Sequence, residues 1–396
     1  MNRESLQGHQ EWVLATAVGL VMTGASLVAP ILPLYALEFG VSYTAAGALI
    51  TGFALARLSF DMIGGVAGDR FGARRVTMSG ALLIAVAGVT AALAPSYWVL
   101  LLSRFIEGVG SALFTTAAFQ FLVQITERSR LGRATALFQT GMLVGFAIGP
   151  FAGGYLAQLG DFRTPFWAYA AFGVLVAVIS RLLITDVPSS GRTIGEVFRA
   201  AGSLLRKREI RVLALVAFAL FVMRSGARIT LFPLYGNKVI GLDPASIGTI
   251  LSVSAVANLF VVNFVGRMVD RVGRKPVAVW GLVASAFATA AYGAFGTFTS
   301  LMIVSAVFGV ASGVASIPPP TMVGDLAPEG LEGSAVGLYK MAGDLGFVVG
   351  PLMVGAIADA GAFTTGFVVS GAILLVAAGA MLTIGETGRK LGKASS

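Results

Sequence analysis

The sequence contains two near copies of one stretch, GGVAGDRFGARRV at residues 64–76 and VGRMVDRVGRKPV at residues 265–277. Their matching residues lie 201 positions apart, as Gly65 and Gly266 do. The same offset relates a further set of residues: Gly108, Gly132, Gly145, Gly149, Pro150 and Gly154 match Gly309, Gly333, Gly346, Gly350, Pro351 and Gly355. A constant offset over this distance predicts two tandem halves within the 396 residues.

The composition is typical of a membrane protein. Hydrophobic residues make up 56% of the chain and charged residues 12%, and the mean hydropathy is +0.86. A soluble domain carries about 25% charged residues. Apolar stretches of about 20 residues, each long enough to cross a bilayer as a helix, recur in two sets of six: 12–36, 44–67, 76–95, 97–122, 133–157 and 165–185, then 211–236, 245–266, 276–296, 299–322, 333–357 and 363–384.

These stretches predict an all-α membrane protein with twelve transmembrane helices in two pseudo-symmetric six-helix halves. We expect the halves at residues 1–185 and 211–396, joined by a linker at 186–210. Within the linker, apolar residues from Ile194 to Leu205 fall on one helical face, with basic residues opposite. This pattern predicts an amphipathic helix, which would lie on the membrane surface or form a solvated connection.

The net charge of +9 reflects topology rather than nucleic-acid binding. With twelve spans, 20 of the 28 Lys and Arg residues fall in segments on one side, against Arg163 and Lys238 on the other. Only the acidic loop at 323–332 breaks this asymmetry. The positive-inside rule then places both termini in the cytoplasm of a multi-pass inner-membrane protein. We expect no nucleic-acid partner.

Several chemical classes are not expected. The chain has no cysteine and one histidine, His9, in a polar tail, so we expect no metal site. The glycines of GVGSAL (108–113) lie within an apolar span, and no Gly-Lys-Ser/Thr phosphate loop is present. We therefore predict neither enzymatic activity nor a cofactor. Two parallel halves of apolar helices are instead typical of secondary transporters, whose substrate site lies between the repeats.

The repeated stretches GVAGDRFGARR (65–75) and GRMVDRVGRK (266–275) resemble the signature loop of the major facilitator superfamily. The resemblance implies the fold of that family and a role for each loop as a latch between access states. A basic loop that only sets topology is the alternative. The predicted gating residues are Gly65, Asp69, Arg70, Gly72 and Arg74 in the first copy, and Gly266, Asp270, Arg271, Gly273 and Arg274 in the second. A glycine at 65 or 266 would let helices approach closely.

The span 133–157 contains GMLVGFAIGPFAGG (141–154), which resembles the exchanger signature of the same family. Glycines spaced by four form a smooth stripe along a helix, and proline bends it. The resemblance implies a drug:proton antiporter that exports its substrate, while ordinary small-residue packing is the alternative. The motif residues are Gly141, Gly145, Gly149, Pro150, Gly153 and Gly154.

Charged residues inside the spans are candidates for function, because they are costly at membrane depth. The stretch RFIEGVGSA (104–112) resembles the family's motif linked to proton coupling, and Arg104 and Glu107 can pair at i,i+3. Purely structural pairing is the alternative. The proton-coupling candidates are Glu107, Asp61, Arg104 and Asp344, and the substrate-cavity candidates are Arg57, Arg224, Arg228, Asn258 and Asn263.

An excess of arginine inside the spans would favour an acidic substrate unless partners across helices neutralise it. Many drug exporters of the family carry an acidic residue deep in their first helix, whereas this chain has Thr16, Thr23 and Ser26 there. The hypothesis is a proton-coupled exporter of amphipathic small molecules, acting as a monomer in the bilayer. The alternatives are an organic-anion, sugar or lipid transporter of the same fold, or a membrane sensor that transports nothing.

Overall fold

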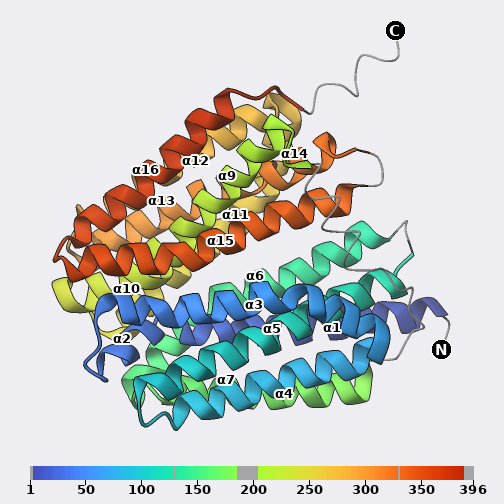
Figure 1. Ribbon diagram of the computed structural model, residues 1–396, viewed down its shortest axis with the longest axis horizontal. Coiled ribbons are helices and arrows are strands. Elements are labelled where there is room, and N and C mark those ends of the chain that lie inside the picture. Colours follow the sequence, from blue (N-terminus) through green and yellow to red (C-terminus); the bar gives the residue numbers. More distant parts are fainter. Residues whose placement is uncertain (1–2, 128–129, 185–203, 329–330, 388–396) are drawn as a thin grey trace. The chain divides into compact units, whose positions relative to one another are not determined.

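The computed structural model describes residues 3–127, 130–184, 204–328 and 331–387, and over these ranges it contains helices joined by short turns (Figure 1). In the first part of the chain the helices are α1 (Arg3–Val28), α2 (Leu32–Leu37), α3 (Tyr43–Phe71), α4 (Ala73–Ala92), α5 (Tyr97–Ile125), α6 (Leu131–Leu159) and α7 (Thr164–Leu183). In the second part they are α9 (Arg208–Val222), η1 (Met223–Leu231), α10 (Phe232–Tyr235), η2 (Gly236–Ile240), α11 (Pro244–Val272), α12 (Arg274–Ala291), α13 (Phe298–Ser316), α14 (Pro318–Leu326), α15 (Glu332–Asp359) and α16 (Phe363–Leu382). The predicted all-α class is confirmed.

Eleven candidate membrane spans occur among the described residues. The helix at the predicted span 276–296, α12, is not one of these eleven. The first predicted span, 12–36, is interrupted, because α1 ends at Val28 and α2 begins at Leu32. Pro30 and Pro33 explain the break, since proline lacks a backbone N–H and disfavours helix in the residue before it. Most of the predicted linker helix lies outside the described residues.

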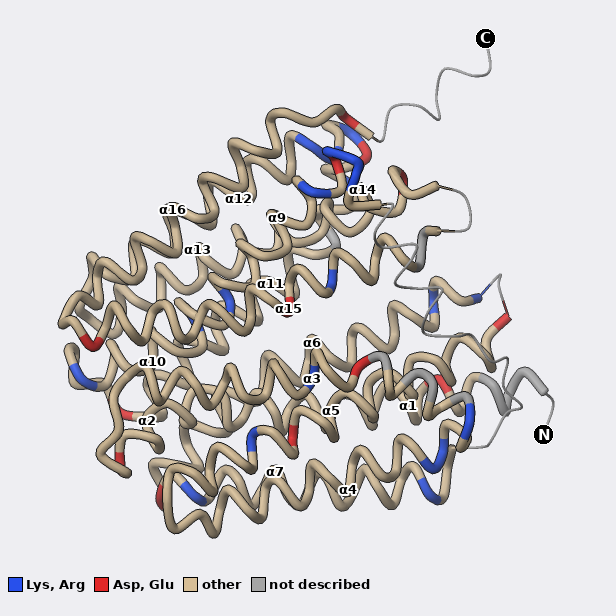
Figure 2. The backbone as a smooth tube through the Cα atoms, viewed as in Figure 1, with Lys and Arg blue, Asp and Glu red and all other residues tan. Residues whose placement is uncertain are grey.

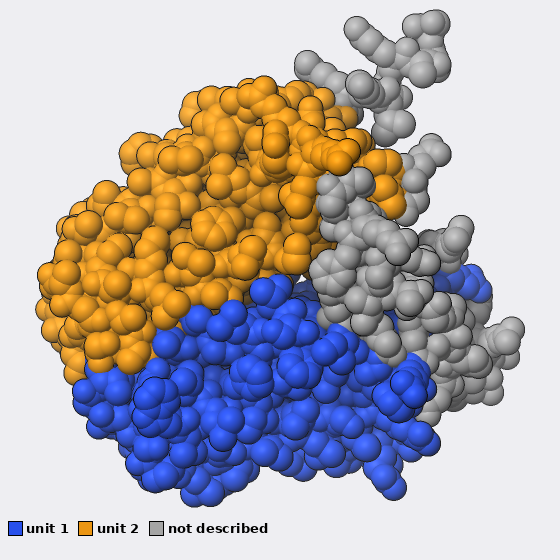
Figure 3. Space-filling view, viewed as in Figure 1, with its two compact units in different colours: residues 1–41, 48–194, 243–252 blue, residues 42–47, 195–242, 253–396 orange. Residues whose placement is uncertain are grey.

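The chain forms two compact units, coloured separately in Figure 3. Unit 1 consists of Met1–Val41, Ala48–Ile194 and Asp243–Ser252, and unit 2 of Ser42–Gly47, Gly195–Leu242 and Val253–Ser396. Unit 1 therefore includes the first turns of α11, and unit 2 includes the first turns of α3. The remainder of each helix belongs to the other unit.

The two units repeat one packing scheme. In unit 1, α1 packs on α6, and α4 packs on both α5 and α7. In unit 2, α9 and η1 pack on α15, and α12 packs on both α13 and α16. Lys and Arg residues of unit 2 gather at the end of its helices near α14 (Figure 2).

Carboxylates cap the first turns of α3 and α11. In unit 2, Asp359 at the end of α15 accepts hydrogen bonds from the backbone N–H groups of Tyr43 (2.7 Å) and Thr44 (3.0 Å). Asp243 accepts from Ser246 N (2.9 Å) and Ser246 Oγ (2.8 Å). Burial raises the pKa of the Asp243 carboxyl, but the hydrogen bonds from Ser246 and from the backbone of Asp243 and Ala245 together outweigh burial and hold the pKa below its usual value.

Candidate functional site

A buried ionic cluster lies inside unit 1. Arg104 and Glu107 on α5 form an ion pair, as their i,i+3 spacing predicts. Arg104 is 4% exposed and Glu107 is 2% exposed. The Tyr169 hydroxyl on α7 donates a hydrogen bond to Glu107 Oε1 at 3.0 Å, and Tyr169 is itself 1% exposed. The carboxylate thus has a partner on each of two helices.

Two other helices complete the surroundings of this cluster. The Arg104 guanidinium lies over the ring of Phe53 on α3, with 5.8 Å from its carbon to the ring centroid. Gly24 on α1 leaves room for the Tyr169 ring, which a Cβ at this position would overlap. The buried Nε of Arg104 has no hydrogen-bond partner among the described residues. A buried charge without its partner is strongly destabilising, because it has lost its hydration and nothing compensates for that loss. The contacts that hold Arg104 and Glu107 together therefore affect the stability of unit 1.

The corresponding positions of unit 2 carry no charge. The 201-residue offset matches Arg104, Glu107 and Tyr169 with Ser305, Phe308 and Ser370. Ser305 Oγ instead accepts a hydrogen bond from the Tyr292 hydroxyl at 2.9 Å, within a buried group of aromatic rings. The ionic cluster is therefore a specialisation of the first half of the chain.

The glycine stripe of α6 forms the interface with α1. A Cβ on Gly141 would collide with the Ala15 carbonyl, and one on Gly149 would collide with Ser26 Oγ. Ser26 Oγ also donates to the carbonyl of Gly145 at 2.8 Å, so a hydrogen bond joins the two helices where they approach. Close helix approach along the stripe, predicted from its spacing, is present in the structure.

At the far end of the stripe the glycines contact two helices. Gly153 still faces α1, at the carbonyl of Leu27, and Gly154 faces the carbonyl of Pro244 at the start of α11. Pro150 lies inside α6, and the next backbone N–H, that of Phe151, donates to Ser252 Oγ at 2.9 Å. In unit 2 the related helix α15 repeats the arrangement, with Gly346 against the carbonyl of Phe218.

The remaining charged candidates of unit 1 form a partly exposed pair. Arg57 Nε and Asp61 Oδ2 lie 3.6 Å apart on α3, with side chains 35% and 31% exposed. An ion pair at this exposure contributes about 0–1 kcal/mol. The structure therefore places the most deeply buried carboxylate–guanidinium pair at Arg104 and Glu107, and the self-neutralising pair at Arg57 and Asp61.

The candidates of unit 2 lie on three different helices. Arg224 and Arg228 are half-buried in η1, a π-helical segment whose wider turn the sequence periodicity did not predict. Such segments are rare in proteins overall, and those that occur are often found at functional sites. Asn258 on α11 donates to the carbonyl of Gly309 (3.3 Å) and to Ser312 Oγ (3.4 Å) on α13. Asp344 is half-buried on α15, and the side chain of Asn263 is outside the described set.

Each signature loop contains a glycine whose backbone conformation only glycine tolerates. Gly72 precedes α4 with φ 88° and ψ 141°, and Gly273 precedes α12 with φ 106° and ψ 162°. Arg70, Asp270 and Arg271 are exposed. The close helix approach expected at Gly266 is not found, because nothing described lies within 4 Å of a Cβ placed there. The side chain of Asp69 and the surroundings of Gly65 are outside the part of the chain that the structure describes.

The second loop makes specific contacts at the start of α12. Arg274 pairs with Asp325 on α14. The backbone N–H groups of Arg274 and Lys275 donate to Glu386 Oε1 and Oε2, both at 3.0 Å. These carboxylates were not among the predicted site residues, because they lie far along the chain from the loop that they contact.

Comparison with known proteins assigns the class. The sequence matches the Major Facilitator Superfamily over residues 14–262 and 213–395, and the chain belongs to this family of membrane transporters. It is 26% identical over 359 residues to the quinolone resistance protein NorA of Staphylococcus aureus (strain MRSA252), covering 88% of this chain and 90% of that protein. It is 23% identical over 347 residues to an uncharacterized MFS-type transporter of Methanocaldococcus jannaschii, covering 85% and 88%.

Solved structures agree on the fold. A bacterial homolog of the human lysosomal transporter Spinster, inward-facing and unoccupied, has a TM-score of 0.80 at 17% identity, covering 95% of this chain and 96% of that one. A mutant form of the nucleoside transporter NupG has a TM-score of 0.78 at 13% identity, covering 95% and 99%. The expected fold class and family are confirmed, and the chain is a multi-pass membrane transporter.

Proposed function

We propose that this transporter is a proton-coupled antiporter that exports amphipathic small molecules, with Glu107 as the group that carries the proton. The supporting observation is the buried Arg104–Glu107–Tyr169 cluster of unit 1. A carboxylate that is 2% exposed must change its partners when it gains or loses a proton. Its protonation state is thereby linked to the hydrogen bond that joins α5 to α7.

Export and exchange rest on a second feature, the close interface of α1 and α6. The glycine stripe brings the two backbones into contact, which suits movement of packed helices as bodies and leaves little space for a leak. The quinolone resistance protein among the relatives favours drug export. We infer an inner-membrane location with both termini in the cytoplasm, from the distribution of basic residues, and a monomer as the working unit.

An amphipathic acid is the favoured substrate class. Arginines outnumber acidic residues in the spans, and quinolones carry a carboxylate that a guanidinium can bind through two hydrogen bonds. Arg224 and Arg228 on η1 are the candidates for this contact. The alternative substrates of the same fold, organic anions, sugars or lipids, are distinguished by the same transport assay.

The test is transport in proteoliposomes that contain a pH-sensitive dye. With an imposed proton gradient, we expect a quinolone to drive proton movement through the wild-type protein and not through Glu107→Gln. Glu107→Gln should still bind the quinolone, measured by quenching of intrinsic fluorescence. Glu38→Gln, at an exposed glutamate, is the matched control and should behave as wild type.

The proposal has a clear opposing result. Unchanged proton-coupled transport by both Glu107→Gln and Asp61→Asn would exclude these carboxylates as proton carriers. Quinolone uptake without any proton movement would exclude antiport, and no movement of drugs, acids, sugars or lipids would favour a sensor.

A further inference from the structure

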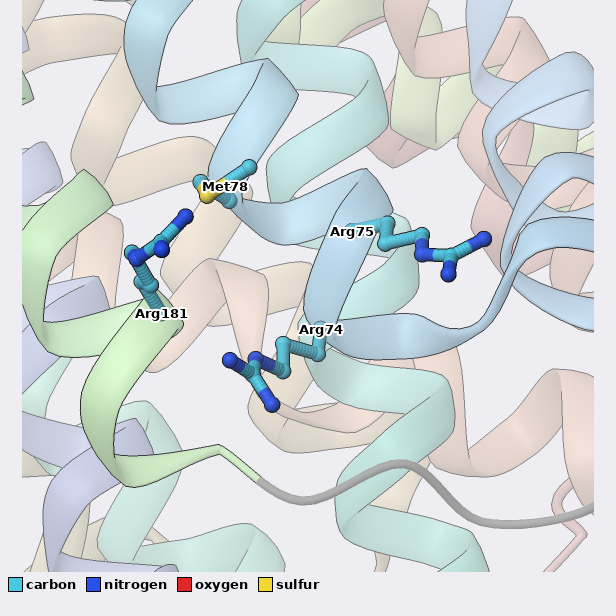
Figure 4. Close-up of a pocket in the computed structure, with 4 residues that line it drawn as sticks. All are labelled: Arg74, Arg75, Met78 and Arg181. Atoms are coloured by element: carbon cyan, nitrogen blue, oxygen red, sulfur yellow. The ribbon is translucent and has the colours of Figure 1, made fainter.

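A small basic pocket lies in unit 1, apart from the ionic cluster. It has a volume of about 240 Å³ and is lined by Arg74, Arg75, Met78 and Arg181 (Figure 4). The first two arginines belong to the first turn of α4, and Arg181 belongs to the last turn of α7. Figure 4 shows Arg74 and Arg181 extending from their two helices into the region between them, whereas the guanidinium of Arg75 extends away from both. Guanidinium groups that share a space repel one another, so an anion between them stabilises the arrangement.

The chemistry of the pocket fits a phosphate group. Each guanidinium presents N–H donors in a planar fork that matches the oxygens of a phosphate. The backbone N–H groups at the start of α4 add the partial positive charge of a helix N-terminus. The first turn of α4 contains no acidic residue that would neutralise this charge.

The second half of the chain shows what occupies the equivalent position there. In unit 2 the start of α12 holds a carboxylate, since Glu386 accepts from the N–H groups of Arg274 and Lys275. The 201-residue offset matches Glu386 with Thr185, a neutral residue outside the described ranges. Among the described residues of the first half, the hydrogen bonds recorded at the start of α4 include none to a carboxylate like that of Glu386 in the second half.

Apolar side chains extend from the pocket along both helices. Exposed residues repeat every three or four positions on α4 and on α7, and these are Leu82, Val86 and Val89 on α4, Leu93 directly after its end, and Val174, Val178 and Leu182 on α7. The two helices pack against each other. In a membrane protein such exposed apolar stripes face acyl chains, and a free anion would make no use of them.

We propose that this pocket binds the phosphate of an acidic phospholipid, whose acyl chains lie on the exposed stripes of α4 and α7. Basic pockets between transmembrane helices on the cytoplasmic side are suited to such headgroups. The lipid contacts Arg74 and Arg75, the last two residues of the signature stretch 65–75, so its binding stabilises the position of that loop. The inference is independent of which compound is transported.

The test uses the purified full-length protein in a neutral detergent, with lipid binding measured by native mass spectrometry. We expect phosphatidylglycerol to bind the wild type at least about tenfold more tightly than phosphatidylcholine with the same acyl chains. The double variant Arg74→Gln/Arg181→Gln should lose this preference. A matched double variant, Arg130→Gln/Arg133→Gln, removes the same charge near the start of α6 and should change the affinity less than about twofold.

Three results would overturn the proposal. One is an equal loss of phosphatidylglycerol affinity in the pocket variant and the matched variant. Another is displacement of phosphatidylglycerol by millimolar inorganic phosphate, which would make the pocket a site for a free anion. The third is a preference for phosphatidylglycerol that the wild type lacks and that appears only after Asp186→Asn. That result would mean that the chain's own carboxylate occupies the pocket in the wild type. The single variant Arg181→Gln, at an exposed residue, provides the same comparison if the double variant does not fold.

Discussion

The Tyr169 hydroxyl donates to Glu107 Oε1 at 3.0 Å, across 62 residues of sequence and between two helices. Glu107 Oε2 pairs with Arg104 on its own helix. Because both oxygens are occupied, any change in the charge of Glu107 alters contacts on α5 and α7 together. Substitutions can separate the contribution of this cluster to stability from its proposed role in proton coupling.

Removal of the tyrosine hydroxyl tests the contact between the helices. Tyr169→Phe should lower the free energy of unfolding by about 1.5–3 kcal/mol, the range for a hydrogen bond to a charged group. Unfolding in detergent, followed by circular dichroism, measures this change. Tyr155→Phe removes a hydroxyl from a side chain that is 45% exposed and should change stability by less than about 0.5 kcal/mol. Equal effects of the two variants would contradict the structural account.

Removal of one or both charges tests the ion pair. Glu107→Leu leaves a buried guanidinium without its carboxylate and should lower the free energy of unfolding by about 3–5 kcal/mol. The double variant Arg104→Leu/Glu107→Leu should recover most of this loss, because no uncompensated charge remains. Both variants should lack proton-coupled transport in liposomes. A double variant that is stable and still couples protons would separate the cluster from transport.

The glycine stripe is tested by adding a single methyl group. Gly149→Ala places a Cβ where Ser26 Oγ lies and should lower stability by about 1–3 kcal/mol through overpacking of α1 against α6. Gly132→Ala, on the same helix where nothing described lies within 4 Å, should be neutral or stabilising by up to about 1 kcal/mol. The melting temperatures of the two variants should therefore shift in opposite directions or differ by several degrees.

The backbone of the signature loop is tested in the same way. Gly72→Ala should lower the free energy of unfolding by about 1–3 kcal/mol, because φ 88° with ψ 141° is open only to glycine. Gly266→Ala lies within α11 with open space around it and should not destabilise the protein. Chemical unfolding of the purified variants measures both values, and an unchanged Gly72→Ala protein would refute the assigned strain.

Much of the fold follows from the sequence because hydropathy and the 201-residue offset act over long stretches. Apolar length identifies the helices, and the repeat relates them in pairs. Two local features were not predicted. The π-helix at Met223–Leu231 has the apolar period of an ordinary α-helix, so the sequence pattern does not reveal its wider turn. The break after Val28 depends on two prolines inside an otherwise continuous apolar stretch.

The candidate site was predictable only where its contacts are local. Arg104 and Glu107 are three residues apart, so helical geometry brings them together. Tyr169 lies in another helix and is uncharged, so the search for charged residues inside the spans did not find it. Glu386 and Asp359 were also missed, since each caps a helix more than 100 residues away.

The cap on α3 also has a consequence for biosynthesis. The N–H groups of Tyr43 and Thr44 receive their carboxylate from Asp359, which is 316 residues after Tyr43. At about 5–20 residues per second, a ribosome needs roughly 16–63 s to reach that aspartate. During this interval the start of α3 has been synthesised and has no cap from α15. The nascent first half is therefore completed by one of the last helices to be translated.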